Sequence, residues 1–236
     1  MSGAPRALFF DVFGTCVDWR TCVAREVGTL AARLGRDDVD PEGVADAWRA
    51  LYQPQMETVR SGARPWVNLD VLHRGALDIV LADAGLDEVT APERDELTRA
   101  WHRLDPWPDA VEGLTRLKGI AVIAPHSNGH VALLLAMARR AGLPWDLILG
   151  AETARAYKPS PESYLRNVAL VGMEPPEVMM VAAHNSDLAA AAALGMRTAF
   201  VRRPAEHGPA QTTDLAPEGD WDVVADDLVE LAGRLS

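Results

Sequence analysis

The chain has 236 residues, of which 48% are hydrophobic and 24% are charged, as is ordinary for a soluble globular protein. Its formal net charge is −11, so the sequence offers no basic face for nucleic acid and little attraction to an anionic membrane surface. Only two cysteines, no recognisable leader and no stretch near the ~20 apolar residues of a membrane span predict a reduced, cytoplasmic protein.

The first predicted element is a short strand. Residues 7–10 form a continuous apolar run that ends at Asp11, a pattern typical of a strand buried on both faces of a parallel sheet. Residues 20–104 are then predicted to be almost entirely helical, because apolar residues recur at helical spacing. The segments with this spacing are 22–34, 44–60, 69–81 and 95–104.

After Pro106-Trp107-Pro108 the pattern changes to alternating strands and helices. The predicted strands are 119–124, 147–149, 178–182, 198–201 and 223–224, and the predicted helices are 131–140, 161–171, 188–194 and 226–235. Residues 207–221 form a Pro/Gly-rich stretch that is predicted to be a surface loop without an assigned role.

This order predicts an α/β protein with a doubly wound, Rossmann-like parallel sheet and an inserted helical cap. The core would comprise residues 1–17 and 105–236, and the cap residues 18–104. A block inserted after the first strand is most simply a cap over the carboxyl end of that strand, where ligands bind in open α/β sheets. The alternative is one α/β domain without a separate cap.

Asp11 is the leading candidate for a catalytic group. A carboxylate at the exit of a buried strand is costly to desolvate unless a partner lies close by. Gly14 permits a tight turn, and the hydroxyl of Thr15 can return to the carboxylate. The alternative is an aspartate that merely caps the turn, which is common after strands.

Three further polar segments follow predicted strands or precede helices. They are His126-Ser127-Asn128-Gly129, Tyr157-Lys158-Pro159 and Ala183-His184-Asn185-Ser186-Asp187. Each has an ordinary alternative: helix capping by Ser127, Asn185 or Asp187, and a surface position for Lys158. Because strand ends converge on one crevice in a doubly wound sheet, the four segments together predict a nucleophile, an anion-binding hydroxyl, a cation and a second carboxylate.

The order of these motifs resembles that of the haloacid dehalogenase superfamily, and the chain is most similar to the type II 2-haloacid dehalogenases. The resemblance covers essentially the whole length. It rests on the segments Asp11-Val12-Phe13-Gly14-Thr15, Ser127-Asn128-Gly129 and Tyr157-Lys158-Pro159.

Phe13 favours dehalogenation over the phosphatase chemistry of most members of the superfamily. The phosphatases carry a second aspartate two residues after the nucleophile, as an acid and base for the leaving alcohol, whereas halide departure needs no protonation. The last motif here has one carboxylate, Asp187, where Mg²⁺-dependent members gather several. We therefore expect no metal and no cofactor. The alternatives are a Mg²⁺-dependent phosphatase and a non-catalytic binding protein on the same scaffold.

The resemblance implies that Asp11 displaces the halide of a short 2-haloacid, and that water then hydrolyses the ester to a 2-hydroxy acid of inverted configuration. Lys158 and Thr15 would orient Asp11. The same resemblance implies the remaining roles. Ser127, with backbone N–H groups near Val12 and Phe13, would hold the substrate carboxylate. Asn128 and the cap residue Arg49 would hold the halide, and Tyr164 would hydrogen-bond near the nucleophile.

Water activation is where the sequence departs from the pattern of the family. Asp187 aligns with a water-orienting aspartate, and His184 stands where an asparagine is usual, so that His184 could act as a base or a water anchor. An alternative for His184 is a hydrogen bond to Asp187. For Arg49 the alternative is an exposed helical residue paired with Asp46 or Glu42. By analogy with relatives, a homodimer is also expected.

Overall fold

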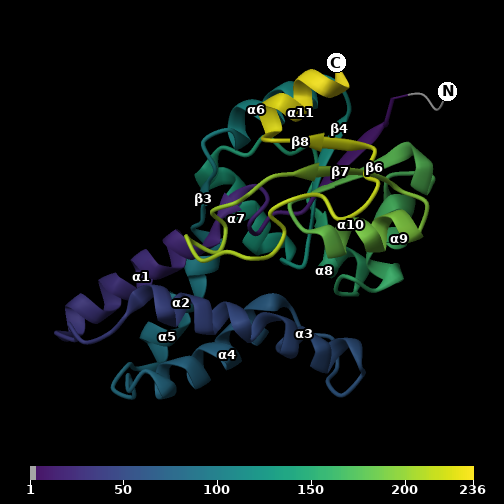
Figure 1. The fold of residues 1–236 in the computed structure, drawn as a ribbon. Coiled ribbons are helices and arrows are strands. Elements are labelled where there is room, and N and C mark those ends of the chain that lie inside the picture. Colours follow the sequence, from purple (N-terminus) through teal and green to yellow (C-terminus); the bar gives the residue numbers. More distant parts are fainter. Residues whose placement is uncertain (1–3) are drawn as a thin grey trace. The chain divides into compact units, whose positions relative to one another are not determined.

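The computed structural model describes residues 4–236, which form two compact units (Figure 1). The α/β unit comprises the residues up to Asp18 together with Asp105–Ser236, and the helical unit comprises Trp19–Leu104. No helix among residues 4–236 is both long enough and apolar enough to cross a membrane.

A parallel sheet lies at the centre of the α/β unit. Within the described residues its strand order is β5-β4-β1-β6-β7-β8, and all neighbouring strands pair in parallel. The strands are β1 (Ala7–Phe10), β4 (Val122–Ser127), β5 (Leu149–Gly150), β6 (Val178–Ala182), β7 (Arg197–Val201) and β8 (Val223–Ala225), while β2 (Val17–Asp18) and β3 (Asp105–Pro106) form a small antiparallel pair. The order reverses between β1 and β6, so a ligand crevice is expected beyond their carboxyl ends.

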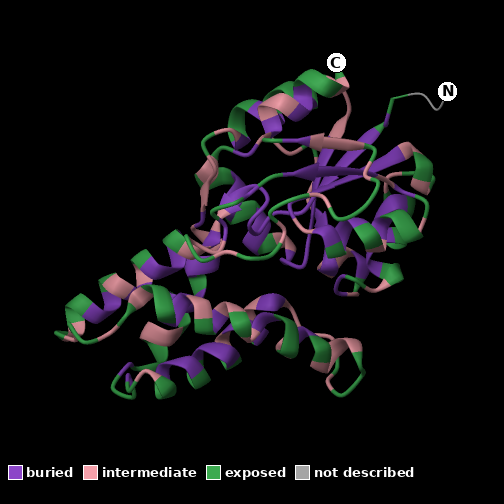
Figure 2. Ribbon diagram, viewed as in Figure 1, coloured by how far each residue is buried: buried purple, intermediate pink, exposed green. Residues whose placement is uncertain are grey.

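Helices cover both faces of this sheet (Figure 2), which explains why its strands β1 and β6 are apolar throughout. On one face, Phe9 packs in a cluster with Tyr164 and Leu188 of helices α9 (Pro161–Leu170) and α10 (Asn185–Ala193). Helices α6 (Ala110–Lys118) and α11 (Leu228–Leu235) lie together on the other face (Figure 1). The remaining helices of this unit are α7 (Val131–Ala141), α8 (Ala151–Ala154) and the 3₁₀ turn η2 (Pro175–Glu177).

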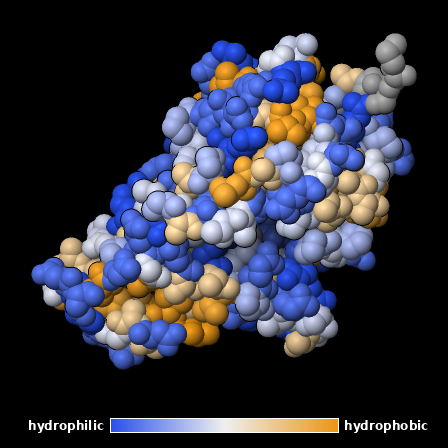
Figure 3. Space-filling model, in the orientation of Figure 1, coloured by the Kyte–Doolittle hydropathy of each residue, from blue (hydrophilic) through white to orange (hydrophobic). Residues whose placement is uncertain are grey.

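The helical unit consists of α1 (Trp19–Leu34), α2 (Pro41–Ala50), α3 (Tyr52–Arg60), α4 (Leu69–Asp83), α5 (Ala91–Thr98) and the 3₁₀ turn η1 (Arg99–His102). The starts of α2 and α5 carry side-chain caps. The Asp40 side chain accepts a hydrogen bond from the Glu42 N–H at 3.1 Å, and Thr90 and Glu93 form a capping box. Figure 3 shows apolar side chains gathered in patches among polar ones on the face drawn there.

Most predicted elements are present, with shifts that have physical causes. The periodic segment 44–60 is two helices separated at Leu51, because Pro54 lacks the N–H that a continuous helix would use. The predicted strand 119–124 lies later, at Val122–Ser127, and His126 therefore lies in the strand and not after it. Helix α6 was not predicted, and α10 begins three residues earlier than expected.

Two helical glycines test the packing of the α/β unit. A Cβ on Gly113 of α6 would lie 2.5 Å from the backbone carbonyl carbon of Leu228, whereas a Cβ on Gly233 of α11 would meet nothing within 4 Å. We expect Gly113→Ala to lower the free energy of unfolding by about 1–3 kcal/mol, and Gly233→Ala to raise it by about 0.5–1 kcal/mol. Urea unfolding measures both, and equal effects would contradict the described packing of α6 on α11.

Candidate active site

Asp11 lies directly after β1, between the ends of β4 and β6. Its N–H donates to the carbonyl of Val181 at 2.9 Å, which continues the pairing of β1 with β6 to this residue. The residue is only 7% exposed. The sheet therefore holds this carboxylate in a largely water-excluded position where charge must be balanced by nearby groups.

Lys158 supplies that balance. Its Nζ lies 2.8 Å from Asp11 Oδ1 and also contacts Asp187 Oδ2, and all three residues are buried. Burial alone would raise the pKa of Asp11, but the charge of Lys158 and the hydrogen bond with His184 outweigh it and hold that pKa below its usual value. Burial opposes the charge on Lys158 as well, yet the two carboxylates raise its pKa. Lys158 and His184 thus hold Asp11 in its ionised form.

Thr15 fixes the second oxygen of Asp11. Its hydroxyl donates to Asp11 Oδ2 at 2.8 Å and accepts from the N–H of Ala183, after β6, at 2.9 Å. Gly14 makes the turn between Asp11 and Thr15 possible because its φ is 87°, a conformation that favours glycine. The predicted contact of the Thr15 hydroxyl with the Asp11 carboxylate is therefore present.

Asp187 is held from two sides in the first turn of α10. Lys158 contacts its Oδ2, and the hydroxyl of Tyr164 on α9 donates to its Oδ1 at 2.6 Å. Burial and the charge of Asp187 raise the pKa of Tyr164, so the phenol stays protonated and remains a donor. Tyr164 is thus linked to Asp11 indirectly, through Asp187 and Lys158.

His184 contacts Asp11 and not Asp187 among the described contacts of its ring. Its Nδ1 lies 3.2 Å from Asp11 Oδ2, and its Nε2 lies 2.8 Å from Oε2 of Glu206. Burial works against its charge, but Glu206 and Asp11 together raise the pKa of His184 well above the ordinary value. In place of the hydrogen bond to Asp187 that the sequence left open, the ring of His184 bonds to Asp11.

Ser127 and Asn128 lie at the end of β4, beside β1. The amide oxygen of Asn128 accepts from the backbone N–H of Lys158 at 2.8 Å, and the hydroxyl of Ser127 accepts from the N–H of Gly129 at 3.1 Å. Val12 and Phe13 are buried in the turn after Asp11. Asn128 therefore anchors the segment that carries Lys158, a contact the sequence did not predict.

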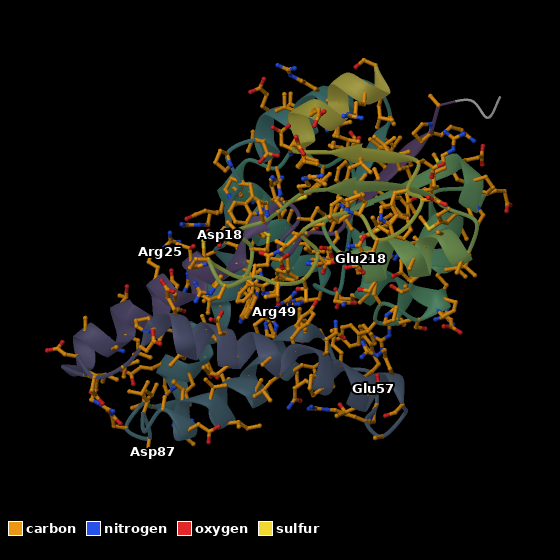
Figure 4. All side chains as sticks on the ribbon, viewed as in Figure 1. Asp18, Arg25, Arg49, Glu57, Asp87 and Glu218 are labelled. Atoms are coloured by element: carbon orange, nitrogen blue, oxygen red, sulfur yellow. The ribbon has the colours of Figure 1, made fainter. Side chains whose placement is uncertain are left out.

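Arg49 belongs to the helical unit, where it projects from α2 (Figure 4). Its guanidinium lies over the rings of Tyr52 and Trp19, at 4.2 Å and 5.3 Å from their centroids. Asp46 and Glu42, its expected ion-pair partners, pair with Arg20 instead. Within residues 4–236, Nη1 of Arg49 has no hydrogen-bond partner.

The network in the α/β unit joins Asp11 directly to the side chains of Thr15, Lys158 and His184, and through Lys158 to Asp187 and Tyr164. Comparison with known proteins places this arrangement in a family. Residues 5–195 match the model of the haloacid dehalogenase-like hydrolases. The chain belongs to this family.

The similar proteins within that family include dehalogenases. The structure of the defluorinating L-2-haloacid dehalogenase Rha0230 is 54% identical and aligns with 98% of this chain and 95% of its own, with a TM-score of 0.96. That of the L-2-haloacid dehalogenase PA0810 is 46% identical, aligns with 98% of each chain and has a TM-score of 0.94.

A third relative is (S)-2-haloacid dehalogenase 1 of Pseudomonas sp. (strain CBS-3), which is 30% identical over 84% of this haloacid dehalogenase-like hydrolase and 85% of its own length. Phosphoglycolate phosphatases match as well, and that of Pseudomonas aeruginosa is 28% identical over 86% of this chain and 72% of its own length.

Glu206 is the residue of this network that the sequence reasoning missed. It lies in the loop after β7, is 1% exposed and contacts the ring of His184. The rule that drew attention to the other strand ends applies equally to β7, since polar residues follow Val201 directly. A buried glutamate there was indistinguishable from the ordinary surface glutamate by sequence.

The lowered pKa of Asp11 predicts a loss of stability in acid. An unfolded aspartate titrates at about pH 3.9, above the folded-state pKa, so the unfolded state binds the proton first and stability falls as the pH drops below about 4. In Asp11→Asn this dependence should be shallower, by up to ~1.4 kcal/mol per pH unit. Urea unfolding below about pH 5 measures it. Asp220→Asn, which removes an exposed carboxylate, is the control, and parallel profiles for wild type and Asp11→Asn would contradict the assignment.

Proposed function

We propose that this hydrolase cleaves the carbon–halogen bond of short 2-haloacids, without a metal, through an ester formed on Asp11. The observation that carries the proposal is a buried carboxylate at the end of β1 that Lys158 keeps ionised at 2.8 Å. Desolvation leaves such an anion reactive towards an electrophilic carbon, while Thr15 and Lys158 fix its orientation. The names of its similar relatives support the same chemistry.

The carboxylates of the site do not fit the Mg²⁺ of the phosphatase alternative. Both oxygens of Asp11 are engaged, Oδ1 by Lys158 and Oδ2 by Thr15 and His184. Both oxygens of Asp187 are engaged as well, by Tyr164 and Lys158. A divalent cation needs several free oxygen ligands, and the ammonium of Lys158 lies between the two carboxylates that would have to supply them.

Phe13 distinguishes the two chemistries further. Its side chain is 2% exposed and occupies the position where the phosphatases carry an acid for the leaving alcohol. A phenyl ring cannot transfer a proton, and a halide leaves without one. Displacement of a halide at carbon requires no proton-transferring group at this position, so an apolar side chain such as Phe13 is compatible with it.

In the first step an oxygen of Asp11 attacks the halogen-bearing carbon, and the carbon–halogen bond breaks as halide leaves. Lys158 stays paired with Asp187 after the charge of Asp11 is lost, so a buried cation is never left without a counter-charge. In the second step water attacks the carbonyl carbon of Asp11 and releases the 2-hydroxy acid, whose configuration is inverted by the first step.

The substrate carboxylate is assigned to the end of β4. Ser127 ends β4, which pairs with β1, and Val12 and Phe13 follow Asp11 directly, so the Ser127 hydroxyl and the backbone N–H groups of this turn stand at neighbouring strand ends and can donate to an anion. Asn128, whose side-chain oxygen is engaged by Lys158, retains its amide N–H groups as donors for the halide.

The halide role of Arg49 stays a prediction from the resemblance to the dehalogenases. A guanidinium that rests on two aromatic rings keeps its charge without a carboxylate partner, and its Nη1 has no hydrogen-bond partner within residues 4–236. A guanidinium that has no carboxylate partner can bind a weakly hydrated anion such as a halide. Action of the helical unit as a cap, a cytoplasmic location and a homodimer also stay predictions from the sequence.

Halide release from chloroacetate, fluoroacetate and 2-chloropropionate in the presence of EDTA tests the function. We expect release with EDTA present, and its loss in Asp11→Asn, because the proposed ester forms on the Asp11 carboxylate and an amide is a far weaker nucleophile. Phosphate release from small phosphate esters that depends on Mg²⁺ and outpaces halide release would overturn the proposal. Unchanged activity in Asp11→Asn would overturn the role of the nucleophile.

The halide role of Arg49 has its own test. We expect Arg49→Lys to lower kcat at least about tenfold, because an ammonium cannot lie flat on both rings while it faces an anion. Arg33→Lys, which alters an exposed arginine of α1 that pairs with Glu93, is the matched control and should leave kcat unchanged. Equal kcat in the two variants would remove Arg49 from the site.

A further inference from the structure

Glu206 lies directly against the turn that carries the nucleophile. A Cβ on Gly14 would fall 2.0 Å from Oε1 of Glu206, so only a glycine at this position admits the buried carboxylate. Glu206 accepts from Nε2 of His184 through both oxygens, at 2.8 Å and 3.1 Å. The turn after β1 and the loop after β7 thus enclose one imidazole between two carboxylates.

The ring of His184 has a different role on each side. Nδ1 faces Asp11 Oδ2 at 3.2 Å and Nε2 faces Glu206. While Asp11 is ionised, both nitrogens carry protons, because each faces a carboxylate, and an imidazolium of this kind cannot act as a base. Other charged groups lie one step away: Lys158 and Asp187 beyond Asp11, and His207, whose Nε2 is 3.6 Å from Glu206 Oε1.

Esterification removes one of these two carboxylates. The Asp11 ester carries no charge, so the proton on Nδ1 loses its counter-ion, whereas the proton on Nε2 keeps Glu206 as its acceptor. We propose that the charge of Asp11 switches His184: the imidazolium of the free enzyme becomes, in the ester, a neutral imidazole whose bare Nδ1 is the general base for water. This inference rests on the proposed dehalogenation.

Glu206 is then a positioning residue that selects the productive tautomer. By accepting from Nε2–H it leaves the lone pair on Nδ1, the nitrogen that faces the Asp11 carboxyl group. The same bond keeps the ring in place after Asp11 ceases to hold it. The switch prevents His184 from acting before the ester exists and readies it afterwards.

The proton balance of the cycle closes. Displacement forms the carbon–oxygen bond and releases halide, and His184 then gives its Nδ1 proton to solvent. In hydrolysis Nδ1 accepts a proton from water as its oxygen bonds to the Asp11 carbonyl carbon. The bond from that carbon to the substrate oxygen then breaks, the leaving alkoxide takes the proton of the new carboxylic acid, and Asp11 and the imidazolium are restored. One proton, one halide and one hydroxy acid leave per turnover.

Nitrogen-15 NMR of histidine-labelled protein tests the switch directly. Asp11→Asn places a neutral group of the same shape where the ester would form. We expect His184 to be doubly protonated in the wild type at about pH 7 and to be neutral, with the proton on Nε2, in Asp11→Asn. Glu218→Gln, which alters an exposed carboxylate of the loop before β8, should leave the wild-type signal. A His184 that is protonated equally in wild type and Asp11→Asn would overturn the switch.

Rapid-quench mass spectrometry with chloroacetate separates the two chemical steps. His184→Asn should still form the Asp11 adduct but hydrolyse it about 10²-fold or more slowly, so that the adduct accumulates. Glu206→Gln should slow the same step by a smaller factor and change its pH dependence, while Glu218→Gln should behave as wild type. Adduct hydrolysis at the wild-type rate in His184→Asn would overturn the inference. Absence of both halide and adduct from the wild type would instead overturn the proposed function.

Discussion

The site depends on one buried ammonium. Lys158 lies between Asp11 and Asp187, and without its ammonium these two buried carboxyl groups would lack the counter-charge that a largely dry position requires. Its charge outweighs the desolvation of the nucleophile, and its backbone N–H is in turn held by Asn128. Geometry and reactivity therefore have the same origin: the pairing that keeps Asp11 charged also fixes where it points.

The sheet brings these groups together because it is parallel and reverses its order at β1 and β6. Asp11 follows β1, Asn128 follows β4, and His184 and Asp187 follow β6, so residues far apart in sequence share one edge. Short bonds then join neighbouring strand ends, as when Thr15 links the turn after β1 to Ala183 after β6. The scaffold supplies proximity, and individual side chains supply charge and direction.

Sequence reasoning reached the fold and most of the network because both depend on local pattern. Buried parallel strands are continuous apolar runs, and Asp11, Lys158 and Asp187 stand at positions that such strands and their following helices determine. It did not reach Glu206, because a glutamate in a polar loop looks alike whether buried or exposed. It also left the partners of His184 open, since one of them, Glu206, reaches the ring only through the path of the loop after β7.

The helical unit also contains contacts that could not be predicted from the sequence. Its helices and caps follow from periodicity, but the partners of its charged residues do not. Asp46 and Glu42 lie about one and two helical turns before Arg49 and yet pair with Arg20 of α1, because tertiary packing brings a second arginine to them. Arg49 is thereby left to stack on Tyr52 and Trp19.

The most direct test of Asp11 as the nucleophile is a single turnover in water enriched in oxygen-18, with enzyme in excess over a 2-haloacid. If Asp11 forms the ester and water attacks its carbonyl carbon, the hydroxy acid takes its new oxygen from the protein. The label should then appear in the peptide that contains Asp11, as detected by mass spectrometry. Label in the hydroxy acid and none in Asp11 would show that water displaces the halide directly, and would contradict the account.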